Sequence, residues 1–361
     1  MPSRITKITV LHPDLRIHGG AERYAHSVIR TLHQLGYNVD IWDIHRALGP
    51  VLRMGLKLFP RFTLLKYALV CAAWRISGAC GDAIVHTFAC GPSAGHTSIS
   101  VLHTPDIFST KRQNLIYNML RPNWVRCKYI TICRWLAAPK PAMVYITNSP
   151  WTYARLSPAV RRQTYVIPPP IPPITPKTSP PKSKSLLTIS RFTPSKRIDR
   201  AIAACDRVIP HHPELTLTLF GAPQGATYRR LKRAAGTRPW LRLRSGDDHV
   251  KNHLLETSQF GLHTAENEHF GISICEMIAA GRIPLVHRSG SGPDFGVPEQ
   301  FLFAGTEELA ARISAALDIN DQEYEATVQD LQSNALFCAA QQHNTQLTAF
   351  FKTHLPAPSQ C

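Results

Sequence analysis

Three basic residues lie close together near the middle of the chain, at Arg191, Lys196 and Arg197. The segment follows an apolar run typical of a strand, and its Thr193-Pro194 pair is typical of the cap and first residue of a helix. The other two cations would follow Arg191 in the first helical turn, where cations oppose the helix dipole. Cations and free amides at one helix N-terminus predict a phosphate-binding site. A solvated basic turn is the alternative, and no Walker pattern accompanies the segment.

Two glutamates with seven residues between them, Glu268 and Glu276, form the second candidate site. The helix predicted around Glu276 is apolar on nearly every side, so we expect it to be buried. A buried carboxylate is costly unless it is hydrogen-bonded or paired, and sugar hydroxyls are partners from which it accepts well. Glu268 precedes the helix beside Phe270 and Gly271, whose backbone amides can also donate. A structural ion pair is the alternative for Glu276.

Three weaker candidates accompany these sites. The loop 289–293, Ser-Gly-Ser-Gly-Pro, follows a predicted strand close to the glutamate segment. Gly19 and Gly20 precede a predicted helix and could let backbone amides approach a phosphate. His103 ends an apolar run at 99–102 and could act as an acid, a base or a hydrogen-bond donor. The alternatives are plain turns for the glycines and a satisfied structural histidine for His103, one of 17 histidines.

Strands and helices alternate along the chain and must position these residues. In the first half, a strand at 5–11, a helix at 21–35 and a strand at 39–42 predict a βαβ unit. In the second half, strands are predicted at 186–190, 215–220, 241–243, 260–263 and 283–287, and helices at 194–209, 227–235, 250–257 and 271–280. This alternation predicts an α/β protein with parallel sheets, which bind ligands at the carboxyl ends of their strands.

Prolines divide the chain into two parts. Residues 168–184 carry eight prolines, which leave few backbone donors and favour an extended, semi-rigid linker. We therefore predict an N-terminal domain at 1–167, a C-terminal domain at 185–335, and a C-terminal helix within 336–361 that packs back on the N-terminal domain. The length of 361 residues suits two domains.

The positive charge of the chain is concentrated in its first half. The net charge is +17; residues 1–170 hold 21 Lys/Arg against 6 Asp/Glu, whereas residues 171–361 hold 20 against 18. This asymmetry predicts an anionic partner, either nucleic acid or acidic lipid headgroups. Segments 50–76 and 111–141 combine cations with large apolar side chains, a pattern typical of helices on an anionic bilayer. In the first segment we expect membrane contact by four cations, namely Arg53, Lys57, Arg61 and Lys66; core packing is the alternative.

Cysteine usage and hydropathy favour the cytoplasm. The nine cysteines form no C-x-x-C pair, so we expect reduced thiols and no zinc site. No signal peptide is recognisable, and the longest apolar run, at 67–74, is far shorter than the roughly 20 residues that span a bilayer. We therefore expect a cytoplasmic protein associated peripherally with the inner face of a membrane.

Between about Ile8 and Asp294 these motifs resemble glycosyltransferase family 4, retaining enzymes with the GT-B fold of two Rossmann-like domains facing each other across a cleft. The spacing of Glu268 and Glu276 matches the family's paired-glutamate motif, and Arg191 with Lys196 matches its donor-phosphate pair. The Gly19-Gly20 and His103-Thr-Pro segments match its glycine loop and its cleft histidine. Segments 261–271 and 279–290 look most like those of GDP-mannose-dependent enzymes that extend lipid-linked oligosaccharides with α-1,2-mannose. The chain departs from that subgroup at loop 289–293, which has one residue more.

The resemblance implies roles for the C-terminal residues. Arg191 and Lys196 would neutralise the diphosphate leaving group, and Glu276 would bind the ribose hydroxyls. Glu268 would hold the donor sugar together with the backbone amides of Phe270, Gly271 and Ile272.

For the N-terminal half the resemblance implies that Gly19 and Gly20 approach the diphosphate and that His103 contacts the sugar near the reacting carbon. It also implies that no metal or other cofactor is needed, because fixed cations replace the metal. The adjacent Asp247 and Asp248 lack the spacer of an Asp-x-Asp motif.

The function expected from this resemblance is transfer of mannose from GDP-mannose to a lipid-linked or polysaccharide acceptor at the cytoplasmic face of a membrane. A transferase that uses UDP-glucose, UDP-galactose or UDP-N-acetylglucosamine is one alternative, and a catalytically inactive partner subunit is another. A nucleic-acid-binding protein would use the basic half but would leave Glu276 unexplained, so no nucleic acid partner is expected.

Overall fold

The computed structural model describes residues 7–17, 19–48, 63–93, 97–105, 123–172, 174, 183–355 and 357. It consists of two compact units: unit 1 comprises residues 1–170 and 342–361, and unit 2 comprises residues 171–341. The cations Arg53, Lys57 and Arg61, predicted to contact a membrane, lie outside the described residues.

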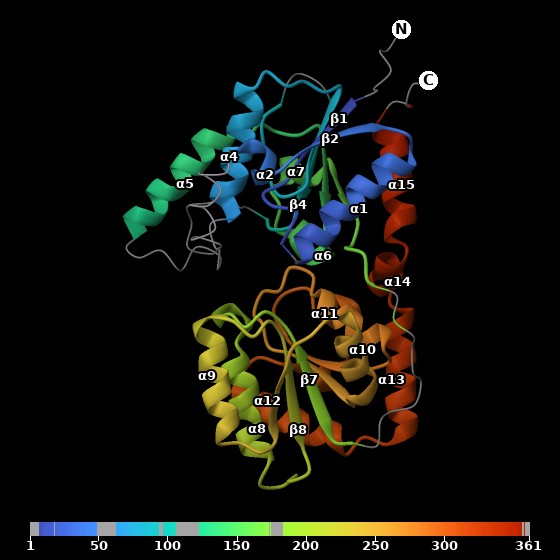
Figure 1. Ribbon diagram of the computed structural model, residues 1–361. Coiled ribbons are helices and arrows are strands. Elements are labelled where there is room, and N and C mark those ends of the chain that lie inside the picture. The colour runs from blue at the N-terminus through green and yellow to red at the C-terminus, as the bar shows by residue number, and fades with distance from the viewer. Residues whose placement is uncertain are drawn as a thin grey trace. The chain divides into compact units, whose positions relative to one another are not determined.

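Unit 1 is built on a six-stranded parallel sheet in the order β2-β1-β3-β4-β5-β6 (Figure 1). Its strands are β1 (Lys7–Leu11), β2 (Asn38–Trp42), β3 (Ala83–His86), β4 (Thr97–Leu102), β5 (Val144–Thr147) and β6 (Thr164–Val166). Its helices are α1 (Gly20–Gln34), α2 (Ile44–Ala47), α4 (Thr63–Ile76), α5 (Asn123–Ala137), α6 (Pro150–Ala154), α7 (Pro158–Arg161) and α15 (His343–His354). The predicted βαβ unit is confirmed, because β1 pairs in parallel with β2 after α1.

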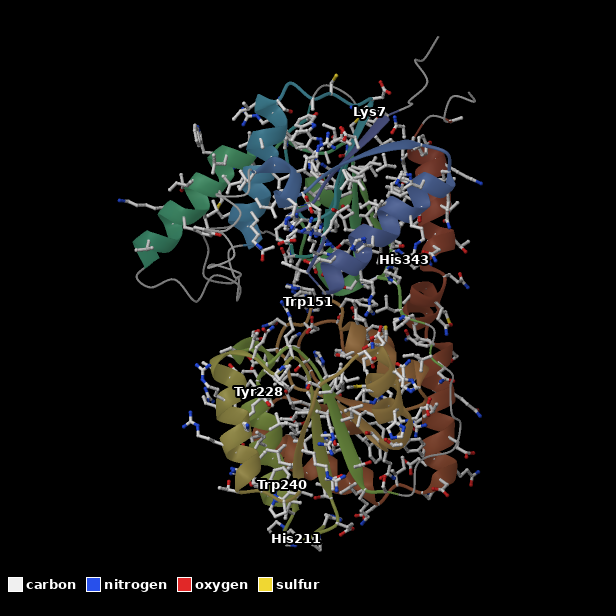
Figure 2. The ribbon with its side chains drawn as sticks, viewed as in Figure 1. Lys7, Trp151, His211, Tyr228, Trp240 and His343 are labelled. Atoms are coloured by element: carbon white, nitrogen blue, oxygen red, sulfur yellow. The ribbon has the colours of Figure 1, made fainter. Side chains whose placement is uncertain are left out.

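Alternating side chains of the unit 1 strands pack against two different helix layers. On β1, Ile8 and Val10 lie in the core formed with α1 and α15, whereas Leu11 packs with α4 and α5. The C-terminal helix α15 is fixed to α1 through His343, labelled in Figure 2, whose Nε2 lies 2.8 Å from Ser27 Oγ. Burial lowers the pKa of His343 to about 4, so this histidine is neutral at pH 7.

Unit 2 holds a second six-stranded parallel sheet, in the order β12-β11-β10-β7-β8-β9. Its strands are β7 (Ser185–Ile189), β8 (Thr216–Phe220), β9 (Leu241–Arg244), β10 (Phe260–His263), β11 (Ile283–His287) and β12 (Leu302–Phe303). The longer helices are α8 (Ile198–Val208), α9 (Gly225–Gly236), α10 (Asp248–Thr257), α11 (Ile272–Ala279), α12 (Thr306–Leu317), α13 (Asp321–Ser333) and α14 (Ala335–Gln341). Helices α8, α9 and α12 cover one face, and α10, α11 and α13 cover the other (Figure 1). All five strands predicted for this half are present, so the predicted parallel sheet is confirmed.

The predicted helix at 194–209 is wrong in its first turn. Pro194–Lys196 form a separate 3-10 turn (η2), and Arg197 adopts a left-handed conformation with φ of 48° before α8 begins at Ile198. Because a left-handed residue interrupts a right-handed helix, Lys196 and Arg197 precede α8 rather than lie in its first turn. Lys196 is therefore carried by a loop after β7.

Candidate active site

Three loops of unit 2 meet at the carboxyl ends of neighbouring strands. Strand β10 pairs with β7 on one side and with β11 on the other. The loop after β7 carries the basic segment 190–197, and the loop after β10 carries the glutamate segment 266–271. The loop after β11 is the glycine-containing loop 289–293. Carboxyl ends of adjacent parallel strands are where such sheets bind ligands, so the topology brings the predicted segments to one edge.

Lys196 and Glu268 form the centre of this edge. Lys196 Nζ lies 2.5 Å from Glu268 Oε2, and the two side chains are 21% and 18% exposed. His263, the last residue of β10, places its Nε2 3.1 Å from the same oxygen. Burial alone would raise the pKa of Glu268, but the charge of Lys196 and the hydrogen bond from His263 outweigh it and hold that pKa well below its usual range. Glu268 is therefore an ionised carboxylate, partly open to solvent.

The backbone around Glu268 explains the glycine in the loop after β11. Gly290 forms an isolated parallel bridge with Glu268, and a Cβ placed on Gly290 would lie only 2.4 Å from the Glu268 backbone nitrogen. The next residue, Ser291, donates its backbone N–H to the carbonyl of Glu268 at 2.8 Å. The expectation that this loop adjoins the glutamate segment is therefore confirmed, and the close approach leaves no room for a side chain at Gly290.

The N-terminus of α11 presents free backbone amides beside Glu268. Gly271 precedes the helix with φ of 89°, and the helix has no side-chain cap. Phe270 is buried, and its carbonyl accepts a hydrogen bond from the Ser291 hydroxyl at 2.6 Å. An uncapped helix start of this kind can donate to an anion or a sugar oxygen. Donation by Phe270, Gly271 and Ile272 to a ligand stays a prediction.

The remaining cations of the basic segment differ in their contacts. Arg200 Nη2 lies 2.6 Å from Glu266 Oε1, and Arg197 Nη1 lies 3.4 Å from the same atom, so both are neutralised within the protein. Arg191 is exposed, and its side chain has no hydrogen bond or ion pair with any part of the chain that the structure describes. Arg191 is therefore the cation of this segment whose charge is not matched by a carboxylate.

Glu276 is buried as predicted, but its partner is a lysine that the sequence analysis missed. Glu276 Oε1 accepts from Lys251 Nζ at 2.9 Å, with side chains only 4% and 6% exposed; Lys251 also contacts Asp248 at 2.8 Å. Within the described ranges no hydrogen bond or ion pair joins Glu276 to Arg191 or Lys196. The structure thus brings Lys196 and Glu268 together. Glu276 forms an ion pair within the protein, which was the alternative to a ligand contact in the sequence analysis.

Signals for the two missed residues can be found in the sequence. Lys251 precedes Leu255 by one helical turn in the predicted helix 250–257, and Leu255 is fully buried, so Lys251 lies on the inward face. His263 ends a predicted strand, where side chains face ligands in parallel sheets. Among 17 histidines, however, only its three-dimensional neighbours distinguish it.

In unit 1, the glycine loop and His103 have structural partners. Gly19 caps α1 in an extended conformation, and a Cβ there would lie 2.4 Å from Glu22 Oε2. Glu22 is buried, with Oε1 3.8 Å from His12 Nε2. His103 Nε2 lies 3.1 Å from the carbonyl of Thr87. These contacts fit the ordinary structural alternatives, and a contact of Gly19, Gly20 or His103 with a ligand stays a prediction.

The prediction that Lys66 contacts a membrane is wrong. Lys66 is 7% exposed, and its Nζ lies 2.8 Å from Asp14 Oδ2. The helix α4 that carries it contributes Tyr67, Val70 and Trp74 to the core. These three side chains of α4 therefore serve packing within unit 1, and the charge of Lys66 is neutralised there.

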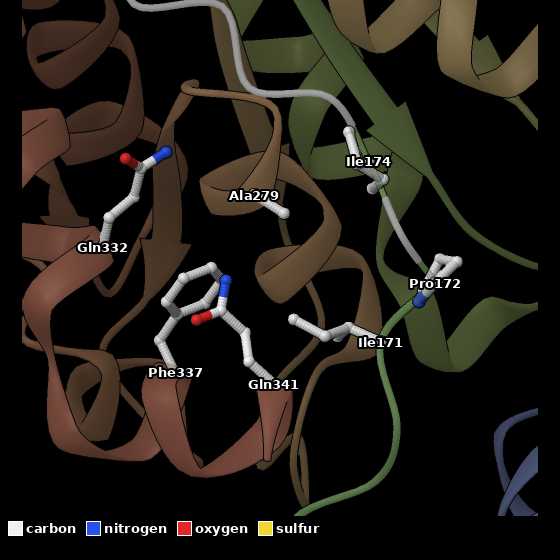
Figure 3. Close-up of a pocket in the computed structure, with 7 residues that line it drawn as sticks. All are labelled: Ile171, Pro172, Ile174, Ala279, Gln332, Phe337 and Gln341. Atoms are coloured by element: carbon white, nitrogen blue, oxygen red, sulfur yellow. The ribbon is translucent and has the colours of Figure 1, made fainter. Parts of the chain in front are cut away.

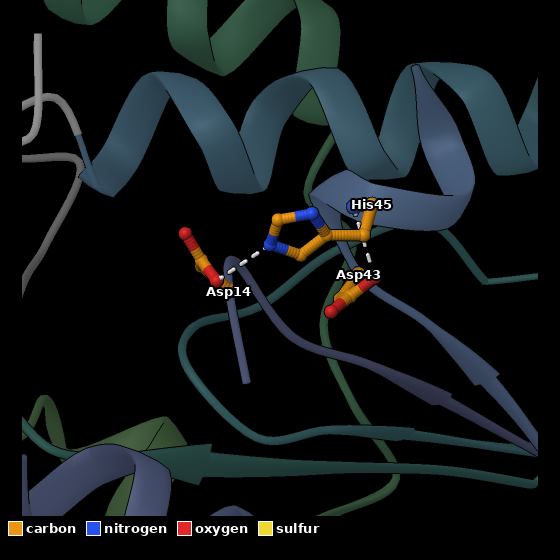
Figure 4. Close-up of side chains that lie close together, drawn as sticks. All are labelled: Asp14, Asp43 and His45. Atoms are coloured by element: carbon orange, nitrogen blue, oxygen red, sulfur yellow. Dashed lines mark hydrogen bonds and ion pairs between the residues drawn. The ribbon is translucent and has the colours of Figure 1, made fainter. Parts of the chain in front are cut away.

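The same lysine bears on a possible metal site. Asp14, Asp43 and His45 place their ligand atoms within 4.8 Å of one another (Figure 4). His45 Nε2 lies 3.1 Å from Asp14 Oδ1, while Lys66 occupies the other oxygen of Asp14. A metal ion would have to compete with this buried ammonium for Asp14.

A cavity of about 340 Å³ lies elsewhere in unit 2 (Figure 3). It is lined by Ile171, Pro172, Ile174, Ala279, Gln332, Phe337 and Gln341. None of the predicted site residues lines it, so it is separate from the loops described above.

No helix within the described part of the chain is both long enough and apolar enough to cross a membrane.

A family model of known proteins matches the chain within unit 2. Residues 174–334 match the family model of glycosyl transferases group 1. The GDP-Man:Man(3)GlcNAc(2)-PP-Dol alpha-1,2-mannosyltransferase of Homo sapiens is 31% identical over 159 residues, which cover 38% of this chain and 32% of that protein. Its counterpart from Xenopus tropicalis is 43% identical over 81 residues, 20% of this chain and 16% of that protein. The chain thus spans about a third or less of the length of these curated relatives.

Solved structures resemble both units. WaaG, a glycosyltransferase involved in lipopolysaccharide biosynthesis, has a TM-score of 0.68 at 15% identity, over 96% of this chain and 99% of that one. Anabaena HepE in complex with UDP-glucose has a TM-score of 0.60 at 16% identity, over 96% of this chain and 99% of that one. At these identities the likeness establishes the fold. The chain therefore has the GT-B fold that its motifs predicted, and its residues 174–334 match the glycosyl transferases group 1 family.

Proposed function

We propose that this chain transfers mannose from GDP-mannose to a lipid-linked or polysaccharide acceptor. The observation that carries the proposal is the Lys196–Glu268 pair, a cation and an ionised carboxylate that are both partly exposed beside the uncapped start of α11. Such a set supplies a charge for a diphosphate and acceptors for sugar hydroxyls within one loop cluster. The mannosyltransferase relatives support the choice of mannose and of GDP.

In this proposal Arg191 and Lys196 stabilise the charge that develops on the diphosphate as the sugar–phosphate bond breaks. Cations held in place before the reaction stabilise the transition state without reorganisation, and one such interaction contributes about 10²–10³ in turnover. Arg191 has a charge that no described carboxylate neutralises, and Lys196 can exchange Glu268 for phosphate. No metal ion or cofactor is part of the proposal, because these side chains would supply the positive charge.

Glu268 and the amides at the start of α11 are proposed to hold the sugar, and Glu276 to accept from the ribose hydroxyls. Glu276 is ion-paired with Lys251, yet a carboxylate has room for several hydrogen bonds, so the pair is compatible with a bound ribose. Gly19, Gly20 and His103 are proposed to contact the donor from unit 1.

A UDP-sugar donor is the second candidate, because the structurally similar HepE is known in complex with UDP-glucose. The test is a panel of GDP- and UDP-sugars in which release of the nucleoside diphosphate is measured with the purified chain. Selective turnover of GDP-mannose is the expected result. Selective turnover of a UDP-sugar would overturn the mannose assignment, and no turnover with any member in the presence of lipid-linked acceptors would overturn the transferase proposal.

We further propose that unit 1 associates peripherally with an anionic membrane at the cytoplasmic face. Helix α5 exposes two large apolar side chains, Ile132 at 54% and Trp135 at 76%. Lys128 and Arg134 are exposed on the same helix, and the sequence has no acidic residue between Asp106 and Asp199. Exposed tryptophan flanked by cations is typical of helices at a lipid interface. The cations Arg53, Lys57 and Arg61, which lie outside the described residues, are proposed to contact the membrane as well.

A further inference from the structure

His263 connects Glu268 to the first turn of α11. His263 is 4% exposed, and its Nε2 lies 3.1 Å from Glu268 Oε2 and its Nδ1 3.2 Å from Ser273 Oγ. An ionised carboxylate can only accept hydrogen bonds, so Nε2 must carry the proton. In the neutral ring Nδ1 is then an acceptor, and the Ser273 hydroxyl donates to it. The three side chains thus form one chain of hydrogen bonds with a defined direction.

Both donors to Glu268 bind the same oxygen atom. Lys196 Nζ and His263 Nε2 each contact Oε2, at 2.5 and 3.1 Å. The other oxygen, Oε1, makes no hydrogen bond to the described residues, and the side chain is 18% exposed. Glu268 is therefore held by one oxygen and presents the other to a ligand.

The two donors differ in what a bound diphosphate would do to them. A phosphate competes with Glu268 for the ammonium of Lys196, because both are anions. His263 is buried and fixed at its far nitrogen by Ser273, so it stays on Oε2 when Lys196 turns to a phosphate. It is then the remaining contact that keeps the carboxylate ionised and in its orientation.

We propose that His263 is a positioning residue that aims Glu268 at the donor sugar, and that Ser273 fixes the tautomer in which His263 donates from Nε2. This inference rests on the function proposed above. It assigns to this histidine and serine a part in the reaction that the sequence motifs did not contain.

The first test compares His263→Ala with His263→Gln. A glutamine amide can place a donor close to the position of Nε2, so His263→Gln should keep most of the turnover. His263→Ala should lower kcat about 100-fold, the effect of a misplaced reacting group, while KM for the nucleotide sugar changes little. Added imidazole should restore part of the kcat of His263→Ala only. If both variants lost the same fraction of kcat, in proportion to the fall in their melting temperatures, and imidazole restored none of it, the role of His263 would be purely structural.

The second test needs no turnover. Nitrogen chemical shifts of the His263 imidazole, identified by their disappearance in His263→Gln, should report the Nε2–H tautomer, both in the free chain and with GDP bound. Ser273→Ala should shift this tautomer equilibrium. A free chain in which Nδ1 instead of Nε2 carries the proton would overturn the inference. If the wild-type chain turned over no nucleotide sugar, the proposed function would fail, and the tautomer would still decide whether His263 donates to Glu268.

Discussion

Two of the Lys–Glu pairs in the described part of unit 2 have similar geometry but different exposure. Lys196 and Glu268 lie 2.5 Å apart with about a fifth of each side chain exposed, whereas Lys251 and Glu276 lie 2.9 Å apart and are almost completely buried. The first pair joins two loops, and the second joins helices α10 and α11. The same chemical pair is thus found both at an accessible edge and in the interior of the unit.

The difference shows which pair can exchange partners. Water reaches Lys196 and Glu268, so a ligand can replace either partner at a modest cost. Removal of one partner from a buried pair leaves a charge without compensation, which is strongly destabilising. We therefore expect the exposed pair to act mainly on turnover and the buried pair mainly on stability.

The largest expected effect is on the buried pair. Lys251→Met should lower the free energy of unfolding by about 3–5 kcal/mol, because Glu276 loses the ammonium of Lys251 in an almost completely buried pair. Urea denaturation followed by circular dichroism measures this. Adding Glu276→Gln to the variant should recover part of the loss. The exposed Lys232→Met on α9 is the matched control, and a Lys251→Met variant as stable as that control would contradict the assignment.

The next effect is on turnover. Lys196→Met should reduce release of GDP from GDP-mannose by about 10²–10³-fold and change stability far less than Lys251→Met does. Steady-state rates and melting temperatures of the same preparations give both quantities. A Lys196→Met variant with a much lower melting temperature but wild-type turnover would contradict the proposed roles of the two pairs.

A third, smaller effect concerns the exposed apolar side chains of α5. Replacing Ile132 and Trp135 on α5 by alanine should weaken binding to vesicles that contain phosphatidylglycerol by about tenfold or more, because exposed apolar area can no longer enter the bilayer. Co-sedimentation measures this, and Val250→Ala in unit 2 is the control. Wild-type binding by the double variant would exclude α5 as the contact, and release of soluble donor product should stay unchanged.

The smallest effect is the pH dependence of the exposed pair. The pKa of Glu268 in the folded chain is held well below its usual range, so its ionised form stabilises the fold above the unfolded pKa of about 4.3. This contribution is lost as the pH falls through the folded pKa. Wild type should exceed Glu268→Gln in free energy of unfolding at pH 7 by on the order of 1 kcal/mol, and the difference should shrink on acidification. A gap that is constant or grows toward acid would contradict the depressed pKa.

Much of the fold followed from local patterns. Apolar runs bounded by turns predicted five strands of unit 2, because buried parallel strands need continuous apolar side chains. The helix around Glu276 was predicted to be buried, and it is. The first turn of the helix at 194 was not predictable in the same way, because the left-handed conformation of Arg197 has no local cause in glycine or asparagine.

The order of motifs along the chain determined which loops carry the candidate site and how a parallel sheet would gather them. Tertiary structure decided the partners. Lys196 and His263 both contact Glu268. Two further lysines form buried ion pairs, Lys251 with Glu276 and Lys66 with Asp14. The packing of whole helices and strands determines which residues far apart in sequence form ion pairs. Their spacing along the chain does not give the distances between them in space.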